Sequence, residues 1–322
     1  MNDRCPTSDQ VLEPVPDASS APGAGAGGAM PFLPAVTVVV PVYNGALTLG
    51  ACLDSLLSLD YPPEKLEILV VDNASIDGTA QILKDYGPAL RVTHEPKRGR
   101  PAACNRGIRE AAWEIIAMTD ADCVLDPRWL LSLVAPLQAE DVGLVGGKIL
   151  SIHPDRPIEL FGEQIHDNAA AIAQRFPSVI GMSWACRRSI LNELHGFDEQ
   201  FLRVQDSDLS FRIAEAGYRL VYAPGAILYH HNEETLWGLY QEGYKHGHWS
   251  VLWCRKHAAA LRQVRRRRFS IASYQSLGRS VLTACCARQQ SERVQARCSL
   301  CFNVGKKLGK LTGSARFRYL EL

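Results

Sequence analysis

Carboxylates dominate the residues of this sequence that could carry out chemistry. Asp120 and Asp122 form the triplet Asp-Ala-Asp directly after an apolar run that ends at Thr119. Because alternate residues of an extended segment share a face, both carboxylates can point at one ligand. Two hard oxygen donors on a short loop suit Mg²⁺ or Mn²⁺ better than zinc, and such a site leaves room for a substrate diphosphate. The alternative is that the pair only makes a turn or caps the next helix.

Two more carboxylates and a histidine are candidates for the same site. Asp206 and Asp208 begin a predicted helix over residues 206–216. A carboxylate there can act as a general base, or it can simply favour the helix dipole. His230 ends an extended segment over residues 226–230, where an imidazole can complete a metal site or be structural only.

The elements that must position these residues alternate between strands and helices. Continuous β-branched runs at Val36–Val42 and Leu66–Asp72 are typical of strands covered on both faces. The alternation predicts an α/β fold with a mostly parallel sheet and right-handed crossovers. Ligands of such a sheet collect at the carboxyl ends of its strands, where Asp72 also falls. Further strands are predicted at 90–93, 114–119, 142–149 and 218–222, and helices at 47–57, from 79, at 101–112 and at 158–174.

The chain divides into three predicted regions. Residues 1–33 are rich in Pro, Ala, Gly and Ser, and we expect a disordered tail because they cannot bury enough apolar surface. Residues 34–232 carry the alternating pattern and form the predicted catalytic domain. Residues 233–322 read as a helical extension, interrupted near residue 270 and around 305–313.

Composition narrows the class of protein. The 322 residues are 47% hydrophobic with a formal charge of +1, so we expect a full core and no nucleic-acid partner. No apolar run is long enough to span a bilayer, and no signal peptide is evident. Ten cysteines without a compact disulfide framework predict reduced thiols and a cytoplasmic protein.

In their order and spacing, the motifs resemble those of the family-2 glycosyltransferases, which have the GT-A (Rossmann-like) nucleotide-sugar-binding fold. The resemblance covers roughly residues 36–231. It is carried by Val39-Val-Pro-Val-Tyr-Asn44, Ile68-Leu-Val-Val-Asp-Asn-Ala-Ser-Ile-Asp-Gly-Thr79, Asp120-Ala-Asp122, Gly196-Phe-Asp-Glu199, Gln205-Asp-Ser-Asp-Leu209 and Pro224-Gly-Ala-Ile-Leu-Tyr-His230.

The resemblance implies a role for each matching residue. Asp206 would be the catalytic base, with Asp208 in support. Asp122 and His230 would hold a divalent metal, Mg²⁺ or Mn²⁺. The residues implied for the nucleotide-sugar donor are Pro41, Tyr43, Asn44, Asp72 for the base, Asn105, and Asp120 for the ribose.

The sequence departs from the family pattern at two positions. Gln205 stands where relatives commonly have an acidic residue, and Cys104 stands where they often have arginine. The charge toward the diphosphate would then come from Arg98, Arg100 or Arg106, and we take Arg100 as the donor-binding candidate.

The function implied is inverting, metal-assisted transfer of a sugar from UDP or another nucleoside diphosphate to an acceptor hydroxyl. The acceptor would be a glycan, a lipid-linked molecule or another alcohol. One alternative is a sugar nucleotidyltransferase, but Val42-Tyr-Asn-Gly-Ala46 lacks a glycine- and basic-rich triphosphate loop. The other is a non-catalytic binding protein of glycosyltransferase descent, which the intact Asp122, Asp206 and His230 disfavour.

A basic cluster in the extension suggests a further partner. Arg262 and Arg265–Arg268 lie beside a helical stretch that carries several tryptophans and tyrosines. Basic and aromatic residues together suit an anionic membrane surface, so peripheral contact with the inner face of the cell membrane is one interpretation. The other is a solvated helix face.

Overall fold

The computed structural model describes residues 33–264, 271–286 and 289–321. All but the last residue of the predicted tail lies outside these ranges, as do four arginines of the basic cluster, Arg265–Arg268.

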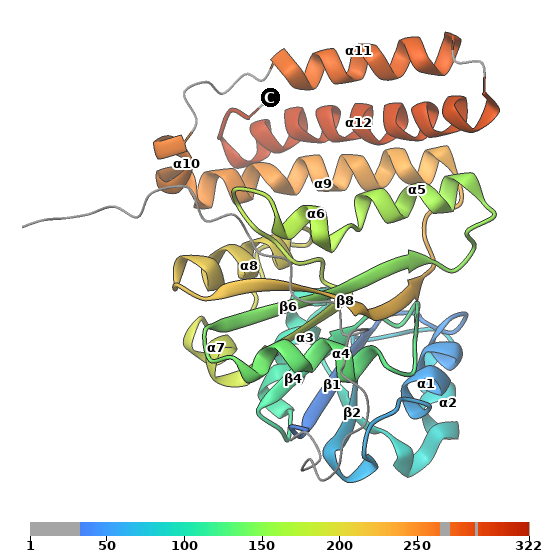
Figure 1. The fold of residues 1–322 in the computed structure, drawn as a ribbon, viewed down its shortest axis with the longest axis vertical. Helices are drawn as coiled ribbons and strands as arrows, with labels where there is room; N and C mark the ends of the chain where they lie inside the picture. Colours follow the sequence, from blue (N-terminus) through green and yellow to red (C-terminus); the bar gives the residue numbers. More distant parts are fainter. Residues whose placement is uncertain (1–32, 265–270, 287–288, 322) are drawn as a thin grey trace, which may run out of the picture. The chain divides into compact units, whose positions relative to one another are not determined.

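One mixed sheet forms the centre of the described part of the chain (Figure 1). Its strands are β1 (Val36–Val42), β2 (Leu66–Asp72), β3 (Arg91–His94), β4 (Ile115–Thr119), β5 (Cys123–Leu125), β6 (Val142–Ser151), β7 (Ser183–Arg187) and β8 (Arg219–His230). Their order across the sheet is β3-β2-β1-β4-β7-β6-β8-β5. The pairs β1–β2, β2–β3, β1–β4 and β6–β8 are parallel, and the pairs β4–β7, β6–β7 and β5–β8 are antiparallel.

Helices cover both faces of this sheet and continue into the C-terminal extension. They are α1 (Leu49–Leu57), α2 (Thr79–Tyr86), α3 (Arg100–Glu110), α4 (Trp129–Val134), α5 (Pro157–Ile165), α6 (Asn168–Ile172), α7 (Arg188–Glu193), α8 (Gln205–Glu215), α9 (Leu236–Lys256), α10 (Ala258–Val264), α11 (Ile271–Cys286) and α12 (Gln290–Phe317). Short 3₁₀ turns lie at Pro63–Lys65, Gly87–Ala89 and Ala135–Gln138.

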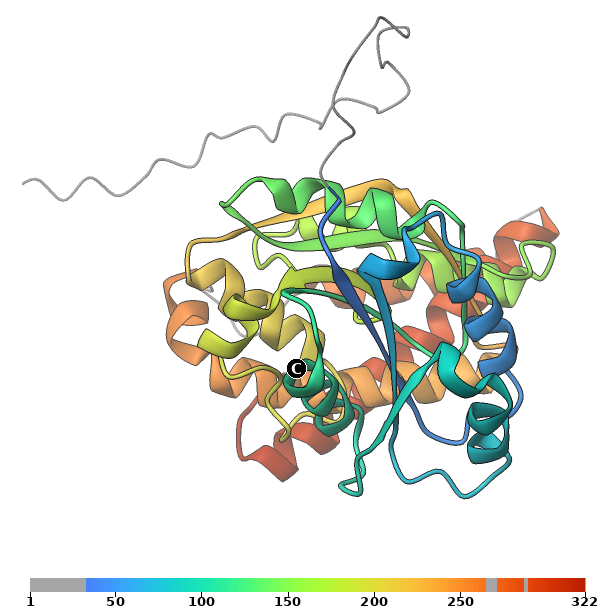
Figure 2. The ribbon, with the colours of Figure 1, turned by 90° about the horizontal axis from the view of Figure 1, so that it is seen from below.

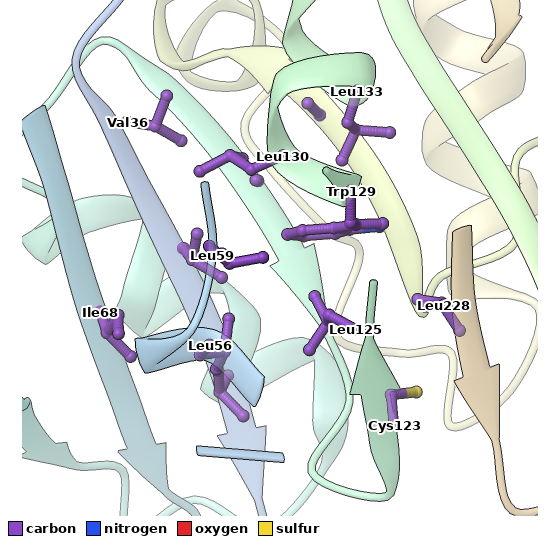
Figure 3. Close-up of a cluster of buried hydrophobic side chains, with 14 of the residues drawn as sticks. Val36, Leu56, Leu59, Ile68, Cys123, Leu125, Trp129, Leu130, Leu133 and Leu228 are labelled. Carbon is purple, nitrogen blue, oxygen red and sulfur yellow. The ribbon is translucent and has the colours of Figure 1, made fainter. Parts of the chain in front are cut away.

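Each central strand contributes alternate residues to two separate hydrophobic cores. On β1, Val38 and Val40 belong to the core under α1 and α4, whereas Val39 belongs to the core under α3 and α8. This follows from the two-residue period of a strand, and it explains why the strand reads as a continuous apolar run. Figure 2 shows α1 and α3 on opposite sides of β1. Figure 3 shows the first core, in which Trp129 of α4 packs among leucines. Packing on both faces therefore holds β1, β2 and β4 in place, so that their carboxyl ends lie at the same edge of the sheet.

Two predicted elements differ from the structure for local reasons. The helix expected over residues 158–174 is two helices, α5 and α6, because the side chain of Asp167 accepts a hydrogen bond from the N–H of Ala170 and starts a new helix. The two extended segments expected before His230 form the single strand β8. Its register against β6 shifts between Gly147 and Lys148, so that three residues of β8 bulge out there.

The break predicted at the glycines of residues 305–313 is wrong, because α12 runs through them without interruption. Gly309 faces α9, where an added Cβ would lie only 2.0 Å from the carbonyl oxygen of Tyr244. On α9, an added Cβ at Gly247 would lie 2.0 Å from the carbonyl oxygen of Lys306. Glycine is therefore needed at these positions so that the two helices can approach at backbone contact.

The extension stacks α11, α12 and α9 side by side, with α5 and α6 between α9 and the sheet (Figure 1). None of the helices in the described ranges is both long and apolar enough to cross a membrane. The nine cysteines of the described ranges are free thiols, as predicted from the sequence.

Candidate active site

A cavity of about 540 Å³ opens at the carboxyl ends of β1 and β4. We call it the donor cavity. It lies where a sheet of this topology collects ligands. Among the predicted site residues it contains Pro41, Tyr43, Asn44, Arg100, Asp120 and Asp122.

The loop after β1 forms one wall of the donor cavity and is held by the loop after β2. Asn44 has a positive φ of 53°, a conformation that asparagine tolerates better than most residues. Its backbone N–H donates to Oγ of Ser75 at 2.9 Å, and its side-chain oxygen accepts from the N–H of Ile76 at 2.9 Å. The next N–H, of Gly45, donates to Oγ1 of Thr79. These cross-links keep the wall in place before any ligand arrives.

A second loop, residues 95–99, is attached through the buried side chain of Asn73. Its amide donates to the carbonyl oxygens of Glu95 and Lys97, and its oxygen accepts from the N–H of Gly99. From this loop the guanidinium of Arg98 lies over the ring of Tyr43, 4.9 Å from its centroid. Tyr43 is 47% exposed, so the pair presents an aromatic face and a cation at the cavity.

Arg100 supplies a buried cation at the floor of the donor cavity. Its Nε and Nη2 donate to Oδ1 of Asp120 at 3.0 and 2.7 Å, and Nη2 also reaches the carbonyl oxygen of Gly181. Burial opposes the charged form, but Asp120 raises the pKa of Arg100, so the guanidinium stays charged. Its Nη1 is buried without a protein partner. Arg106, the third arginine considered, instead pairs with Glu110.

Asp122 and His230 meet across the antiparallel pair β5–β8. Oδ2 of Asp122 lies 3.5 Å from Nε2 of His230. Nδ1 of His230 is 2.8 Å from the side-chain oxygen of Asn232, which can only accept, so Nδ1 carries the proton. The lone pair of Nε2 then faces Asp122, which is the arrangement that metal-binding histidines adopt.

The electrostatics of this pair favour a positive charge between the two side chains, either a second proton on Nε2 of His230 or a cation that takes its place. Desolvation in the cleft opposes ionisation of Asp122, but the hydrogen bond and charge of His230 lower its pKa. Burial lowers the pKa of His230, yet Asp122 outweighs that effect and raises it. Cys123 lies within the same group, but burial raises the pKa of its thiol well above the ordinary value. A protonated thiol is a poor ligand, so Asp122 and the neutral ring of His230 are the members of this group that could ligate a hard divalent cation.

A second cavity of about 290 Å³ shares Asp120 and Asp122 with the donor cavity. We call it the second cavity. His166 lies in its wall, and its Nδ1 is 3.1 Å from the same oxygen of Asn232. Met182 is the one apolar residue in a lining that otherwise consists of Asp120, Asp122, His166, Arg203, His230, His231, Asn232, Glu233 and Glu242.

Asp206 sits in the first turn of α8 and is partly exposed. Its Oδ2 accepts the N–H of Gly181 at 2.9 Å, and its charge acts on Arg100. It lines neither cavity itself. Leu202, four residues earlier, lines the donor cavity, and Met182, next to Gly181, lines the second cavity.

Asp208 and Asn105 lie outside the linings of both cavities. The side chain of Asp208 is fully buried and binds Arg212, Lys256 and His257, so it cannot reach a substrate. These contacts outweigh burial and lower the pKa of Asp208 to about 2. Asn105 is also buried, and its amide holds the backbone of Phe197 through both its oxygen and its nitrogen. Both residues support the site from behind instead of lining it.

Asp72 lies at the end of β2 but lines a separate cavity beside α2, not the donor cavity. Its Oδ1 accepts the N–H of Ser75, and its Oδ2 is 3.3 Å from Nδ1 of His94. Through Ser75, which binds Asn44, it supports the wall of the donor cavity.

The sequence interpretation did not single out Asn73, Arg203 or Asn232. Asn73 was within a quoted motif, next to Asp72, and a buried amide at a strand end is the signal that could have identified it. Asn232 lies two residues after His230, close enough in sequence to be sought as the hydrogen-bond partner of its Nδ1. Arg203 has no local signal, because its place in the second cavity depends on α9.

Comparison with known proteins agrees with this geometry. The sequence profile described as Glycosyl transferase family 2 matches residues 37–207, just over half of the chain. The chain is 29% identical over 214 residues to Glycosyltransferase AglE of Haloferax volcanii. That match covers 61% of this chain and 66% of AglE, so the chain spans just under two thirds of that relative's length.

Solved structures show the same fold. Mannosyltransferase PcManGT from Pyrobaculum calidifontis, in complex with GDP-Man and Mn²⁺, superposes with a TM-score of 0.64 at 24% identity, covering 88% of each chain. S. aureus TarS 1–349, in complex with UDP-GlcNAc, superposes with a TM-score of 0.50 at 15% identity, covering 88% of this chain and 92% of the TarS 1–349 chain. The predicted GT-A fold, with its helical C-terminal region, is confirmed. Sequence motifs, fold and profile agree, and the chain belongs to glycosyl transferase family 2.

Proposed function

We propose that this protein transfers a sugar from a nucleotide-sugar donor to an acceptor hydroxyl with inversion at the anomeric carbon, assisted by Mg²⁺ or Mn²⁺. The observation that carries the proposal is that the donor cavity and the second cavity meet at Asp120 and Asp122. A donor in one cavity and an acceptor in the other would meet at this junction. Holding the two reactants together in this way lowers the activation barrier of the transfer.

The donor cavity suits a nucleoside diphosphate. Tyr43 and Arg98 offer an aromatic face and a cation, and Arg100 and Arg98 offer positive charge to a diphosphate. The structural neighbours were solved with GDP-Man and with UDP-GlcNAc, which supports a nucleotide sugar but leaves UDP and GDP both open for this chain. Asp120, held by Arg100, is oriented to accept from a ribose hydroxyl.

Asp122 and His230 fit a resident divalent cation. Their facing donors, the Nδ1–H tautomer of His230 and the Mn²⁺ in the PcManGT complex support this assignment. When bound there, the cation would act as a Lewis acid that neutralises charge on the departing diphosphate.

The protein's own groups carry the proton transfer. An acceptor hydroxyl is a weak nucleophile, so Asp206 takes its proton while the oxygen forms a bond to the anomeric carbon. The bond from that carbon to the diphosphate oxygen breaks, and the nucleoside diphosphate leaves with the electron pair. The N–H of Gly181 fixes Oδ2 of Asp206, so the carboxylate is held in one orientation during attack. Attack opposite the leaving group inverts the centre.

The decisive experiment incubates the purified protein with Mn²⁺, a panel of nucleotide sugars and simple alcohols or glycans, and measures the nucleoside diphosphate released. Release from at least one nucleotide sugar, abolished by EDTA and restored by Mn²⁺, is expected. Triphosphate consumption in the presence of a sugar phosphate would instead favour a nucleotidyltransferase. Nucleotide binding without any turnover would favour a binding protein.

Two further proposals concern the domain boundary and the attachment of the protein to lipid. We propose that residues 34–232 are the catalytic domain and that the extension from 233 attaches the protein peripherally to anionic lipid. Arg262 is exposed near the end of α10, and Leu308 and Leu311 are exposed on α12. Serine replacements of Arg265–Arg268 should release the protein from anionic vesicles in flotation assays, with uncharged vesicles as the control. A wild-type protein that does not float at low salt would contradict the proposal.

A further inference from the structure

Helix α9 belongs to the extension, beyond the residues that match the family profile, yet it contacts the segment that carries Asp206. We call residues 198–208 the base segment. It joins the Gly196-Phe197 turn to the first residues of α8 and contributes Leu202 to the donor cavity and Arg203 to the second cavity. The last turn of α9 lies beside α8 (Figure 1).

Lys256, the last residue of α9, joins both ends of the base segment. Its Nζ lies 2.7 Å from Oδ2 of Asp198 and 2.9 Å from Oδ1 of Asp208. The next residue, His257, places Nε2 2.8 Å from the same Oδ1 of Asp208. Because Asp208 is fully buried, the two contacts to its carboxylate are shielded from water on that side, and its position is tied to that of α9.

A second contact from α9 holds the middle of the base segment. Nη2 of Arg203 lies 3.4 Å from Oε2 of Glu242. Glu242 also accepts from Nε2 of His246 and lies 3.5 Å from Nζ of Lys245, so its carboxylate is held by its own helix. Arg203 thus meets a partner that is fixed independently of the base segment.

The backbone between these contacts is strained. Val204, two residues before Asp206, has a φ of 65°. A β-branched residue is disfavoured in this left-handed region, and such a conformation persists only where the surroundings hold it. Val204 is held in this conformation by the contact of Arg203 with Glu242 on one side and by that of Asp208 with Lys256 on the other. Strain of this kind, next to a functional group, indicates that the group is kept in a particular orientation.

We propose that Lys256 is a positioning residue for the glycosyl transfer: by binding Asp198 and Asp208 it holds the strained base segment so that Asp206 faces the acceptor. This rests on the proposed function, because it takes Asp206 as the base. The extension then serves the chemical step directly, in addition to any role in attachment. His257 and Glu242 act in the same direction through Asp208 and Arg203.

The test compares Lys256→Met with Lys310→Met. Lys310 forms a similarly shielded ion pair with Glu321 at 3.2 Å, but on α12 and away from both cavities. Lys256→Met loses the pairs with Asp198 and Asp208, and Lys310→Met loses the pair with Glu321, so both variants should lower thermal stability. Lys256→Met should lower kcat by about 10- to 100-fold with little change in donor KM, since a small displacement of a catalytic group has an effect of this size. Lys310→Met should leave kcat near the wild-type value.

Two further measurements separate positioning from stability. Lys256→Arg keeps the charge and can still bridge the two carboxylates, so it should recover most of kcat. Adding Asp206→Asn to Lys256→Met should lower kcat by a smaller factor than it does in the wild type, because the base has already lost its alignment. If Lys256→Met does not fold, His257→Phe keeps a ring at this position but removes the Nε2 donor to Asp208, and it should show the same pattern more weakly.

A readout without turnover keeps the inference testable if the proposed function fails. Amide hydrogen exchange in peptides covering 198–208 should be faster in Lys256→Met than in Lys310→Met. A wild-type protein that is inactive on every nucleotide sugar would contradict the proposed function. The exchange measurement would then still show whether Lys256 holds the base segment in place. Unchanged exchange, or a kcat for Lys256→Met equal to that of Lys310→Met, would overturn the positioning role.

Discussion

Arg100 and Asp120 form a two-pronged contact at the floor of the donor cavity, with Nε and Nη2 at 3.0 and 2.7 Å from Oδ1. The contact distinguishes the two carboxylates of the Asp-Ala-Asp triplet. Asp120 is already paired with a buried cation, whereas the side chain of Asp122 is 44% exposed and faces His230. In the proposed function, Asp122 is therefore the free carboxylate for a divalent cation, and Asp120 is the one that contacts the nucleoside.

The first prediction concerns Asp122. Asp122→Ala should abolish the Mn²⁺-dependent part of nucleoside diphosphate binding, because it removes the charged donor that faces His230. Titration calorimetry with UDP or GDP, with and without Mn²⁺, measures this directly.

The control is Asp141→Ala, which removes an exposed carboxylate paired with Arg219. Asp141 lies just before the start of β6, whereas His230 pairs with the end of that strand. It should bind nucleotide like the wild type. Equal metal-dependent affinity in Asp122→Ala and Asp141→Ala would remove Asp122 from the site.

The second prediction concerns Asp206. Asp206→Asn keeps the side-chain shape and can still accept the N–H of Gly181, but it cannot take a proton. Turnover should fall by about 10²- to 10⁴-fold while donor affinity changes little. Steady-state kinetics at saturating donor and acceptor provide the measurement. Near-normal kcat would mean that another group is the base.

The third prediction concerns the contact between α9 and α12. Gly309→Ala should destabilise the protein by about 1–3 kcal/mol or more, because the new methyl group would lie 2.0 Å from the Tyr244 carbonyl oxygen and the helices must separate. Gly278→Ala on α11 is the matched control, since no atom of the described residues lies within 4 Å of its added Cβ. It should be neutral or stabilise by up to about 1 kcal/mol. Urea unfolding curves compare the two, and equal midpoints would contradict the close contact.

The fourth prediction concerns acid stability and Glu242. Burial opposes its ionisation, but the hydrogen bond of His246 and the charges of Arg203 and Lys245 lower its pKa from 4.5 to about 2. A carboxyl with a depressed folded-state pKa contributes stability that is present above the unfolded value and is lost as the pH falls toward 2. Between pH 4.5 and 2 its contribution should fall by up to about 1.4 kcal/mol per pH unit.

Glu242→Gln removes that titration. Its unfolding free energy should therefore vary less steeply with pH than that of the wild type over this range, while remaining lower near neutral pH. Urea unfolding at several pH values between 5 and 3 gives both slopes. Parallel slopes would show that Glu242 titrates with an ordinary pKa in the folded protein.

Much of the catalytic half could be predicted from the sequence because its signals are local. The β-branched runs of β1 and β2 require burial on both faces, and this places Pro41, Asp72 and Asp120 at strand ends that a parallel sheet brings to one edge. The motifs that follow those strands were sufficient to recognise family 2, whose profile matches the chain. The metal, donor and base assignments remain predictions that the experiments above test.

The resemblance distinguished Asp206 from Asp208, but only the tertiary structure gives a physical reason for the distinction. In sequence the two are equivalent carboxylates at a helix start, but Lys256, 48 residues beyond Asp208, takes Asp208 into a buried ion pair and leaves Asp206 partly exposed. The glycines of α12 predicted a break because helix propensity depends on the local sequence alone. They are present because the backbone of α9 leaves no space for a Cβ at these positions. In both cases the deciding partner lies far along the chain, and local periodicity carries no information about contacts of that kind.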